Sequence, residues 1–492
     1  MSKLKARTAN SLKWNLVDKI STQLLYAITG IILARELNEE DFGLVGALLI
    51  FQAFASLIID SGFSYALLQR KRPSRLDYSS VLWFNLGTAV LFYIILWFCA
   101  PFIAGFFQND FRLVPLARLQ FLVLITNASA IVQVNRLMKA MDVRMVAASN
   151  SLGLFAGGIA GIWLAIEGFG PWAIVWQSLI VSACKALVLW TSTRWRPLAR
   201  FSVASIRSFM GIGLRMMFTS ILNTIFLKIY SFLIGWRVGL GSLGYYTQAD
   251  KWSTMGVSSI GQILTSSFLP ALSTVQNDFE RFNNMASKMN RFTSYLVFPG
   301  LIGLMVVATP LFHGLFGDKW DPSIVLFQLL LLRGIFVVFN TLYTNILLAL
   351  GEAKKILRLE VLRDVLAVAG LVVTFPFIGL RNDGNSVEGL EILLWGQLVA
   401  TVLTWCATLW CVIRSSKGKL VVYIRDMAPY FCLTAVCVPL MGWAGALVPE
   451  AWFKLALELS VALAVYLGVN YVLGSKIQKD IFIYLRCGKL SL

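Results

Sequence analysis

Several long apolar stretches of this sequence each carry one or two charged residues, and these charges are the groups that could do chemistry. Arg333 lies about eleven residues into the apolar stretch 323–349, close to its middle. A charge inside a hydrocarbon layer is costly, and it usually faces a cavity, a partner or a water-filled path. The other charges of this kind are Arg215, Lys228, Lys185, Lys19, Asp18 and Asp364.

Most of these groups are cations. Five of the seven are Lys or Arg, and such side chains bind phosphate oxygens through charge-assisted hydrogen bonds. The pattern therefore predicts a site for an anionic substrate, bound by Arg333, Arg215, Lys228 and Lys19. Arg215 and Lys228 would instead lie near the helix ends if the stretch 208–236 crosses the membrane at a tilt.

The two carboxylates have a different candidate role. Asp18 or Asp364 would be the titrating group if an ion gradient drives the protein. A simpler interpretation is also open, in which Asp18, Lys19 and Lys185 reach the inner membrane interface, or Asp18 pairs with a nearby base. Asp364 is adjacent to Arg363 in the sequence.

Amide side chains in the apolar stretches could hydrogen-bond a sugar, or they could hold neighbouring helices together. They are Asn223, Gln262, Asn340, Asn345 and Gln397. One His and seven Cys show no metal-ligand spacing, and no nucleotide-binding loop of the GxxxxGK[ST] type is present. We therefore expect no metal, no other cofactor and no enzymatic activity.

The elements that position these groups are membrane helices. Of the 492 residues, 58% are hydrophobic and the mean hydropathy is +0.73, whereas soluble proteins are ~45–50% apolar. A helix of ~20 apolar residues crosses a bilayer, so the sequence predicts an all-α, polytopic membrane protein of about fourteen helices, with twelve as the main alternative. The expected helices cover about 14–34, 42–67, 79–104 (ended by Pro101), 114–134, 146–166, 172–192, 208–236, 251–274, 292–315, 323–349, 359–379, 390–413, 427–447 and 452–473.

The net charge of +18 follows the membrane topology. Basic residues gather in short loops between the apolar stretches rather than on one face, which argues against a nucleic-acid partner. About 30 Lys and Arg fall in the segments expected inside and about 5 in the outer loops, the distribution typical of cytoplasmic basic loops. This bias predicts an even number of spans and two cytoplasmic termini, the first preceded by a short basic segment at 1–13.

A repeated motif divides the chain into two halves. Arg35 precedes Gly43 of the sequence DFGL in the first half, and Arg237 precedes Gly244 of LGYY in the second. Many transporters consist of repeated halves with a substrate site between them. We expect an N-terminal lobe at 1–200, a C-terminal lobe at 201–420, and two further helices with a cytoplasmic tail at 421–492.

Short motifs in a fixed order also make the chain resemble a known family. They are Ala34-Arg35-Glu36-Leu37, Asp60-Ser61-Gly62-Phe63, Ala66-Leu67-Leu68-Gln69-Arg70, Ser80-Val81-Leu82-Trp83-Phe84-Asn85, Leu243-Gly244-Tyr245-Tyr246-Thr247-Gln248-Ala249, Phe268-Leu269-Pro270-Ala271-Leu272-Ser273 and Leu315-Phe316-Gly317-Asp318-Lys319-Trp320. Together they resemble the Wzx-type polysaccharide transporters of the multidrug/oligosaccharidyl-lipid/polysaccharide exporter superfamily, especially colanic-acid and teichuronic-acid exporters. The likeness extends from the N-terminus to about residue 420.

The resemblance implies two pseudo-symmetric six-helix lobes plus two C-terminal helices in the bacterial inner membrane. It also implies a flippase that moves undecaprenyl-pyrophosphate-linked oligosaccharide by alternating access, for the export of surface polysaccharide or O-antigen. Lipid-linked oligosaccharide and membrane lipids are then the expected partners, with a polysaccharide polymerase and chain-length machinery as further candidates.

Three other classes stay open at this point. An ion-coupled drug exporter would be expected to have an acidic site, and the intramembrane charge here is mainly basic. A peptidoglycan-precursor flippase is the other member of this first class, which comprises other branches of the same superfamily. A membrane glycan polymerase should place its chemistry on sizeable outer loops, but only 237–250 and 381–388 have any length. A structural subunit of a synthesis complex is the third class.

Overall fold

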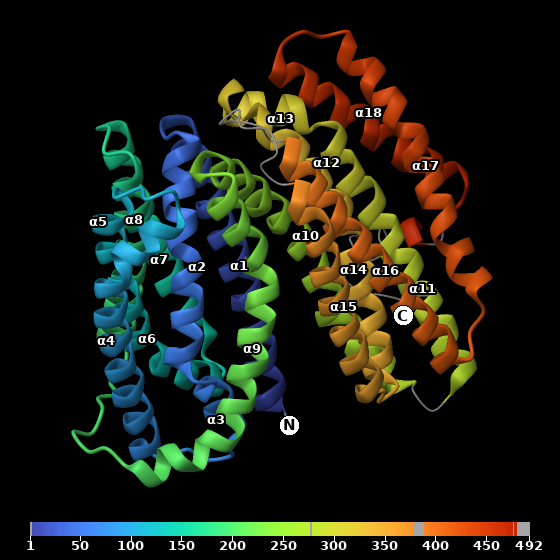
Figure 1. Ribbon diagram of the computed structural model, residues 1–492. Helices are drawn as coiled ribbons and strands as arrows, with labels where there is room; N and C mark the ends of the chain where they lie inside the picture. Colours follow the sequence, from blue (N-terminus) through green and yellow to red (C-terminus); the bar gives the residue numbers. More distant parts are fainter. Residues whose placement is uncertain (1, 276–277, 378–387, 476, 480–492) are drawn as a thin grey trace. The chain divides into compact units, whose positions relative to one another are not determined.

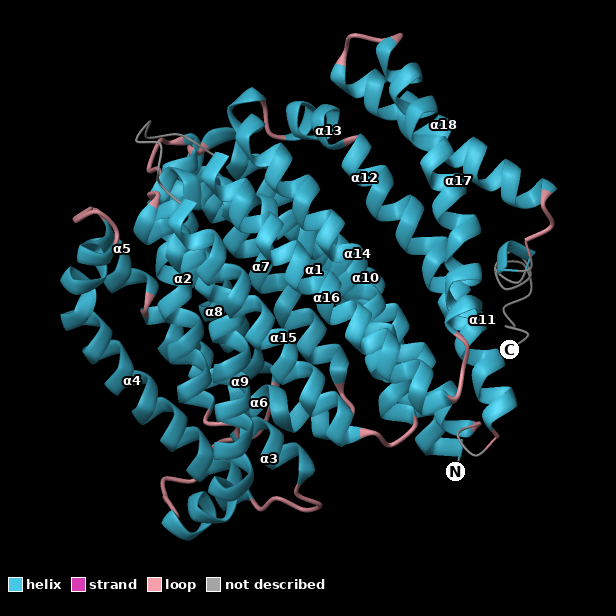
Figure 2. Cartoon of the chain, turned by 45° about the vertical axis from the view of Figure 1, so that its right-hand side comes forward, coloured by secondary structure: helices cyan, strands magenta, loops and turns pink. Residues whose placement is uncertain are grey.

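The computed structural model describes residues 2–275, 278–377, 388–475 and 477–479, and this part of the chain contains helices and no strand (Figures 1 and 2). The prediction of an all-α, polytopic fold is confirmed. The chain divides into two compact units, Met1–Gly244 and Tyr245–Leu492, called unit 1 and unit 2 below. The three-part division at residues 200 and 420 stays a prediction.

Unit 1 contains nine helices in its described residues and the first turn of a tenth. They are α1 (Ser2–Glu36), α2 (Glu39–Asp60), α3 (Phe63–Gln69), α4 (Arg75–Phe106), α5 (Leu113–Gln120), α6 (Leu122–Lys139), α7 (Val143–Ile166), α8 (Pro171–Ser192), α9 (Val203–Arg237) and the start of α10 (Leu240–Thr274).

Unit 2 contains the rest of α10 and eight further α-helices among its described residues. They are α11 (Phe279–Val297), α12 (Gly303–Val306), α13 (Ala308–Leu315), α14 (Asp321–Ala349), α15 (Ala353–Thr374), α16 (Glu388–Ser416), α17 (Leu420–Ala446) and α18 (Ala451–Val472). A π-helical turn at Phe298–Ile302 joins α11 to α12.

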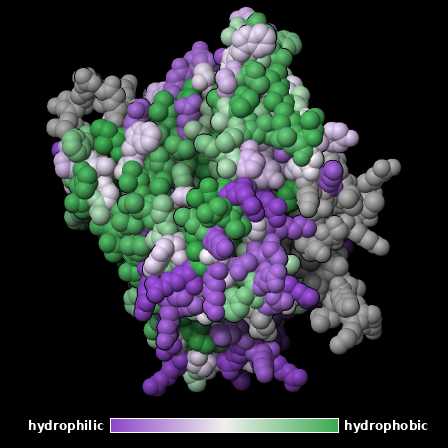
Figure 3. Space-filling model, turned by 90° about the vertical axis from the view of Figure 1, so that its right-hand side faces the viewer, coloured by the Kyte–Doolittle hydropathy of each residue, from purple (hydrophilic) through white to green (hydrophobic). Residues whose placement is uncertain are grey.

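The protein is a multi-pass membrane protein. Eleven helices among the described residues are long and apolar enough to cross a membrane, or twelve if the pair Phe279–Val306 and Ala308–Leu315, bent by 61°, forms one span. Hydrophobic side chains gather over the upper part of the face seen in Figure 3, and hydrophilic ones gather at its lower end. The expected helices at 251–274 and 359–379 exist as α10 and α15 but fall outside this set, so the count of fourteen stays a prediction.

Several expected boundaries were wrong. Pro101 does not end its helix, because α4 continues to Phe106, and membrane helices tolerate an internal proline when neighbouring groups satisfy the freed carbonyl. The basic segment 1–13 is continuous with the first span, since α1 begins at Ser2 and the apolar part of this helix covers Val17–Glu36. The segment 237–250 is mostly helix, because Gly239 adopts a φ of +133° and turns the chain so that α10 begins at Leu240. Residues 381–387 lie outside the described part.

The repeated glycine motifs meet within unit 1. A Cβ on Gly43 would overlap the carbonyl oxygen of Leu240, and a Cβ on Gly244 would overlap that of Glu39. The start of α2 and the start of α10 therefore cross with their backbones in contact. A side chain of any size at either glycine would separate them.

Candidate functional site

Arg333 lies in the most buried of the candidate spans. The span Asp318–Ala349 contains α14. In its most apolar part, 61% of the residues are buried inside the protein, which is the largest share of any span found among the described residues. The Arg333 side chain is half-buried, and its Nε atom is buried without a hydrogen-bond partner in the described part of the chain. An unpaired buried donor costs about 1–3 kcal/mol, and more on a charged group, so this position favours a ligand that supplies an acceptor.

Three residues within two turns of α14 lie on the side of this helix that faces α16. Arg333, Phe336 and Asn340 are three and four residues apart, a spacing that places them on one face of a helix. The Phe336 ring contacts the Trp405 ring of α16 edge to face, with centroids 5.4 Å apart. This face of α14 therefore packs toward α16.

Amide oxygens on both helices lack partners. The Oδ1 atom of Asn340 and the Oε1 atom of Gln397 on α16 are buried without a hydrogen bond from any described residue. A guanidinium binds phosphate, amides bond hydroxyl groups, and an aromatic ring offers an apolar face. Arg333, Phe336 and Asn340 on the shared face of α14 therefore suit an anionic, hydroxyl-rich ligand, whereas Gln397 is about 12 Å along α16 from Trp405. Of the other amides predicted from the sequence, Asn345 is buried and Asn223 is exposed, and the side chain of Gln262 lies outside the described part.

A second polar cluster joins α1, α7 and α8 in unit 1. Both carboxylate oxygens of Asp18 accept hydrogen bonds from Nδ2 of Asn150, each at 3.2 Å. One turn further along α1, the Ser21 and Ser151 hydroxyls lie 2.9 Å apart. Lys185 on α8 interacts electrostatically with Asp18. The structure thus brings Asp18 and Lys185 together, and Lys19 beside them is half-buried.

The two cations of α9 do not share a site. Arg215 and Lys228 are thirteen residues apart, which separates them by about 20 Å along the axis and about 140° around it. Arg215 is exposed among apolar side chains, and Lys228 is half-buried. A ligand of ordinary size that contacts Arg215 would therefore not reach Lys228 in the same position.

Asp364 pairs with its neighbour in the chain. Its Oδ1 atom lies 2.9 Å from Nη2 of Arg363. The pair lies in the middle of α15, with Arg363 exposed and Asp364 half-buried. This ion pair already neutralises the carboxylate, which makes Asp364 a weaker candidate for ion coupling than Asp18.

One buried acidic residue escaped the sequence analysis. The Asp426 carboxylate on α17 accepts a hydrogen bond from the Ser287 hydroxyl and lies 3.5 Å from Nε of Arg291, both on α11. Its side chain is only 5% exposed. In the sequence, Asp426 is a single acidic residue directly after the basic segment that ends at Arg425, and it lies just outside the expected helix 427–447. This position was the one sequence feature that could have identified it.

Residues 32–325 match a family described as polysaccharide biosynthesis protein. Teichuronic acid biosynthesis protein TuaB of Bacillus subtilis is 24% identical over 461 residues, which cover 93% of this chain and 92% of the relative. Lipopolysaccharide biosynthesis protein WzxC of Escherichia coli is 24% identical, covering 84% and 83%. A solved structure of the lipid II flippase MurJ in an inward closed conformation superposes with a TM-score of 0.75 at 13% identity, over 97% of this chain and 100% of that one.

Proposed function

Because the chain belongs to the polysaccharide biosynthesis protein family, we propose that it flips a lipid-linked oligosaccharide across the bacterial inner membrane. The relatives named for teichuronic acid and lipopolysaccharide biosynthesis support a glycan as cargo. The fold shared with a lipid II flippase supports translocation of a lipid-linked sugar. In this proposal the carrier is undecaprenyl pyrophosphate, and the protein works by alternating access.

The observation that carries the proposal is the buried Nε atom of Arg333, which has no hydrogen-bond partner among the described residues and lies within the most buried span found there. Arg333 would bind the pyrophosphate, and the amides of Asn340 and Gln397 would bond sugar hydroxyls. An acidic drug-binding site would need a carboxylate in this place, and α14 carries its only acidic residue, Asp321, in its first turn. The site therefore favours an anionic cargo over a cationic drug.

The remaining cations and carboxylates have secondary roles in this proposal. Lys19, Arg215 and Lys228 of unit 1 would contact the anionic cargo separately, because Arg215 and Lys228 do not share a site. Asp18 would be the titrating group if an ion gradient drives transport, since Asn150 and Lys185 already give it a polar setting inside the membrane. Both termini would lie in the cytoplasm, and a polymerase would receive the product outside.

The test replaces the gene by variants in its own bacterium and follows the lipid-linked oligosaccharide. We expect Arg333→Gln to abolish surface glycan and to accumulate one complete repeat unit that a membrane-impermeant probe cannot reach. Arg333→Lys should retain partial export, since it keeps the charge but loses the guanidinium fork. Arg358→Gln, which removes an exposed arginine of α15, is the matched control.

Each other outcome assigns a different step. Accumulation on the outer leaflet would place the defect after translocation and favour the polymerase class. An Arg333→Gln cell with normal surface glycan and normal protein amount would refute the assignment of Arg333. A gene deletion without any change in lipid-linked sugar would refute the flippase itself.

A further inference from the structure

A strongly basic surface lies where six helices of unit 1 end or begin. The segments 69–77, 133–144 and 190–208 contain eleven Lys and Arg but only two Asp. They cover the ends of α3, α6 and α8 and the starts of α4, α7 and α9. Cytoplasmic loops are basic in most membrane proteins, so charge alone does not define a site. The arrangement of these particular arginines does.

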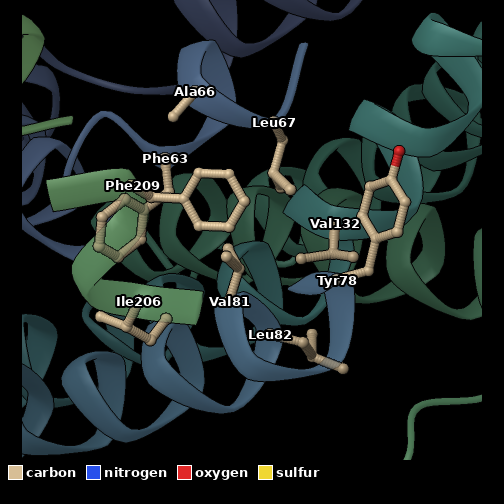
Figure 4. Packing of buried hydrophobic residues seen from close by; sticks show 9 residues of the cluster. All are labelled: Phe63, Ala66, Leu67, Tyr78, Val81, Leu82, Val132, Ile206 and Phe209. Atoms are coloured by element: carbon tan, nitrogen blue, oxygen red, sulfur yellow. The ribbon is translucent and has the colours of Figure 1, made fainter. Parts of the chain in front are cut away.

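The linker between α8 and α9 is fixed to α4. Arg75 donates from Nη2 to the Arg196 carbonyl oxygen at 2.9 Å, and the Trp83 indole donates to the Leu198 carbonyl oxygen at 2.8 Å. The Leu198 amide donates to the Ser79 hydroxyl at 2.9 Å. Beneath this linker, apolar side chains of α3, α4, α6 and α9 pack into one core (Figure 4). The arginines of the linker therefore hold defined positions.

Two guanidinium groups lie over aromatic rings. Arg136 lies 4.8 Å from the Trp195 ring centroid, and Arg196 lies 5.9 Å from that of Trp190. The two indoles contact each other at 6.3 Å. We call Arg75, Arg136 and Arg196 with these two tryptophans the arginine–tryptophan cluster. Some of the donors are used within the protein, since Arg75 donates from Nε and Nη2 to Arg196, Arg196 donates from Nη1 to backbone carbonyls, and Arg136 donates from Nη1 to Gln133. Stacking leaves the remaining N–H groups at the guanidinium edges for an anion.

The cluster has no counter-charge of its own. Among the described residues no carboxylate pairs with its three arginines, and Arg75 and Arg136 are close enough to repel each other. Asp77 is the nearest acid along α4, but it is buried in a capping box with Ser74. An ordered group of like charges at a membrane surface is stabilised by an anion that binds between them.

We propose that this cluster binds the phosphate of an anionic glycerophospholipid from the cytoplasmic leaflet. Exposed apolar side chains beside it, Trp83, Phe201 and Val203, would contact the acyl chains. The amide that contacts the cluster, Gln133, is fully buried and accepts a hydrogen bond from Arg136. The cluster therefore presents guanidinium donors at the surface, and a simple phosphodiester fits better than a glycan. The site is separate from the proposed cargo site and does not depend on the proposed function.

The test measures binding of phosphatidylglycerol to the purified full-length protein in detergent. Each basic residue near a membrane surface contributes ~1 kcal/mol, or about fivefold in affinity. We therefore expect Arg136→Gln and Arg75→Gln each to weaken binding about fivefold, and Arg136→Lys to weaken it less. Arg358→Gln removes the same charge from unit 2 and should bind as the wild type does.

Three results would overturn the proposal. Arg358→Gln could weaken binding as much as Arg136→Gln, which would indicate a general charge effect. Phosphatidylcholine could bind as tightly as phosphatidylglycerol. Inorganic phosphate at millimolar concentration could displace the lipid completely, which would assign the cluster to a soluble anion. The unfolding midpoint without lipid shows whether a variant is folded, and the exposed Arg75 carries the test if Arg136→Gln unfolds.

Discussion

Replacing Gly43 by alanine tests the crossing of α2 and α10. The Cβ of alanine would lie 2.6 Å from the carbonyl carbon of Leu240 and would overlap its oxygen. At Gly244 the corresponding distance, to the carbonyl carbon of Glu39, is 2.7 Å. Two carbon atoms in ordinary contact are about 3.5–4.0 Å apart, so each substitution requires the helices to separate by about 1 Å.

The expected loss of stability follows from the nature of the neighbour. Overpacking in a well-packed interior costs about 1–3 kcal/mol when side chains can shift. Here the obstacle is backbone, which cannot change rotamer, so we expect Gly43→Ala and Gly244→Ala each to cost at least about 3 kcal/mol by the same overpacking rule. Both substitutions separate the same contact, so the double variant should lose less stability than the sum of the two single losses.

Gly87 provides the control. It lies within α4, and a Cβ there would meet no atom within 4 Å. Alanine in place of a helical glycine gains roughly 0.5–1 kcal/mol when nothing obstructs it, so Gly87→Ala should be slightly stabilising. The assay is unfolding of the purified protein in mixed micelles with increasing denaturing detergent. A Gly43→Ala protein as stable as Gly87→Ala would refute the backbone crossing.

Three further substitutions test other contacts. Asp426→Asn should destabilise unit 2 by roughly 1–3 kcal/mol, since a buried charge-assisted bond to Ser287 is lost, and thermal unfolding measures it. Ser74→Ala should cost about 1 kcal/mol in the same assay, because it removes the N-cap of α4. The hydrogen bond from Arg112 lowers the pKa of Asp110, so this carboxylate stabilises the fold above its unfolded pKa of about 3.9 and the contribution disappears as the pH falls through the lower folded value. Asp110→Asn should therefore differ from wild type at pH 6 and converge with it in acid, in an unfolding series against pH.

The membrane helices could be predicted from the sequence because hydropathy reports directly on the solvent of each stretch. The stretch 172–192 and the helix Pro171–Ser192 coincide almost residue for residue, since Gly170 and Pro171 mark its start. The resemblance to the Wzx-type polysaccharide transporters is also confirmed, by the family match and by the relatives. Motif order carries such information even where identity is low.

Tertiary contacts could not be predicted in this way. The intramembrane position of Arg333 was visible in the sequence, but the burial of its Nε atom without a partner among the described residues is a result of tertiary packing. Asp426 was missed because a residue near a helix start is ordinarily solvated, and only the packing of α11 buries it. Hydropathy indicates whether a helix lies mainly in lipid or in water, but it does not indicate which side chains of neighbouring helices contact each other.

The repeated glycines are a second feature whose role could not be predicted from the sequence. Sequence spacing favours a tight turn at Gly43 and at Gly244, and neither has a positive φ. Their role is close approach between helices, and this role recurs at the far end of α9, where a Cβ on Gly213 would lie 2.7 Å from the Ser61 carbonyl oxygen. Backbone contacts thus hold α2 against the start of α10 at one end and against α9 at the other, which explains why unit 1 extends past the repeat boundary to residue 244. A sequence repeat identifies equivalent helices, whereas close backbone contacts at glycine determine which helices pack together, and the two divisions of this chain need not coincide.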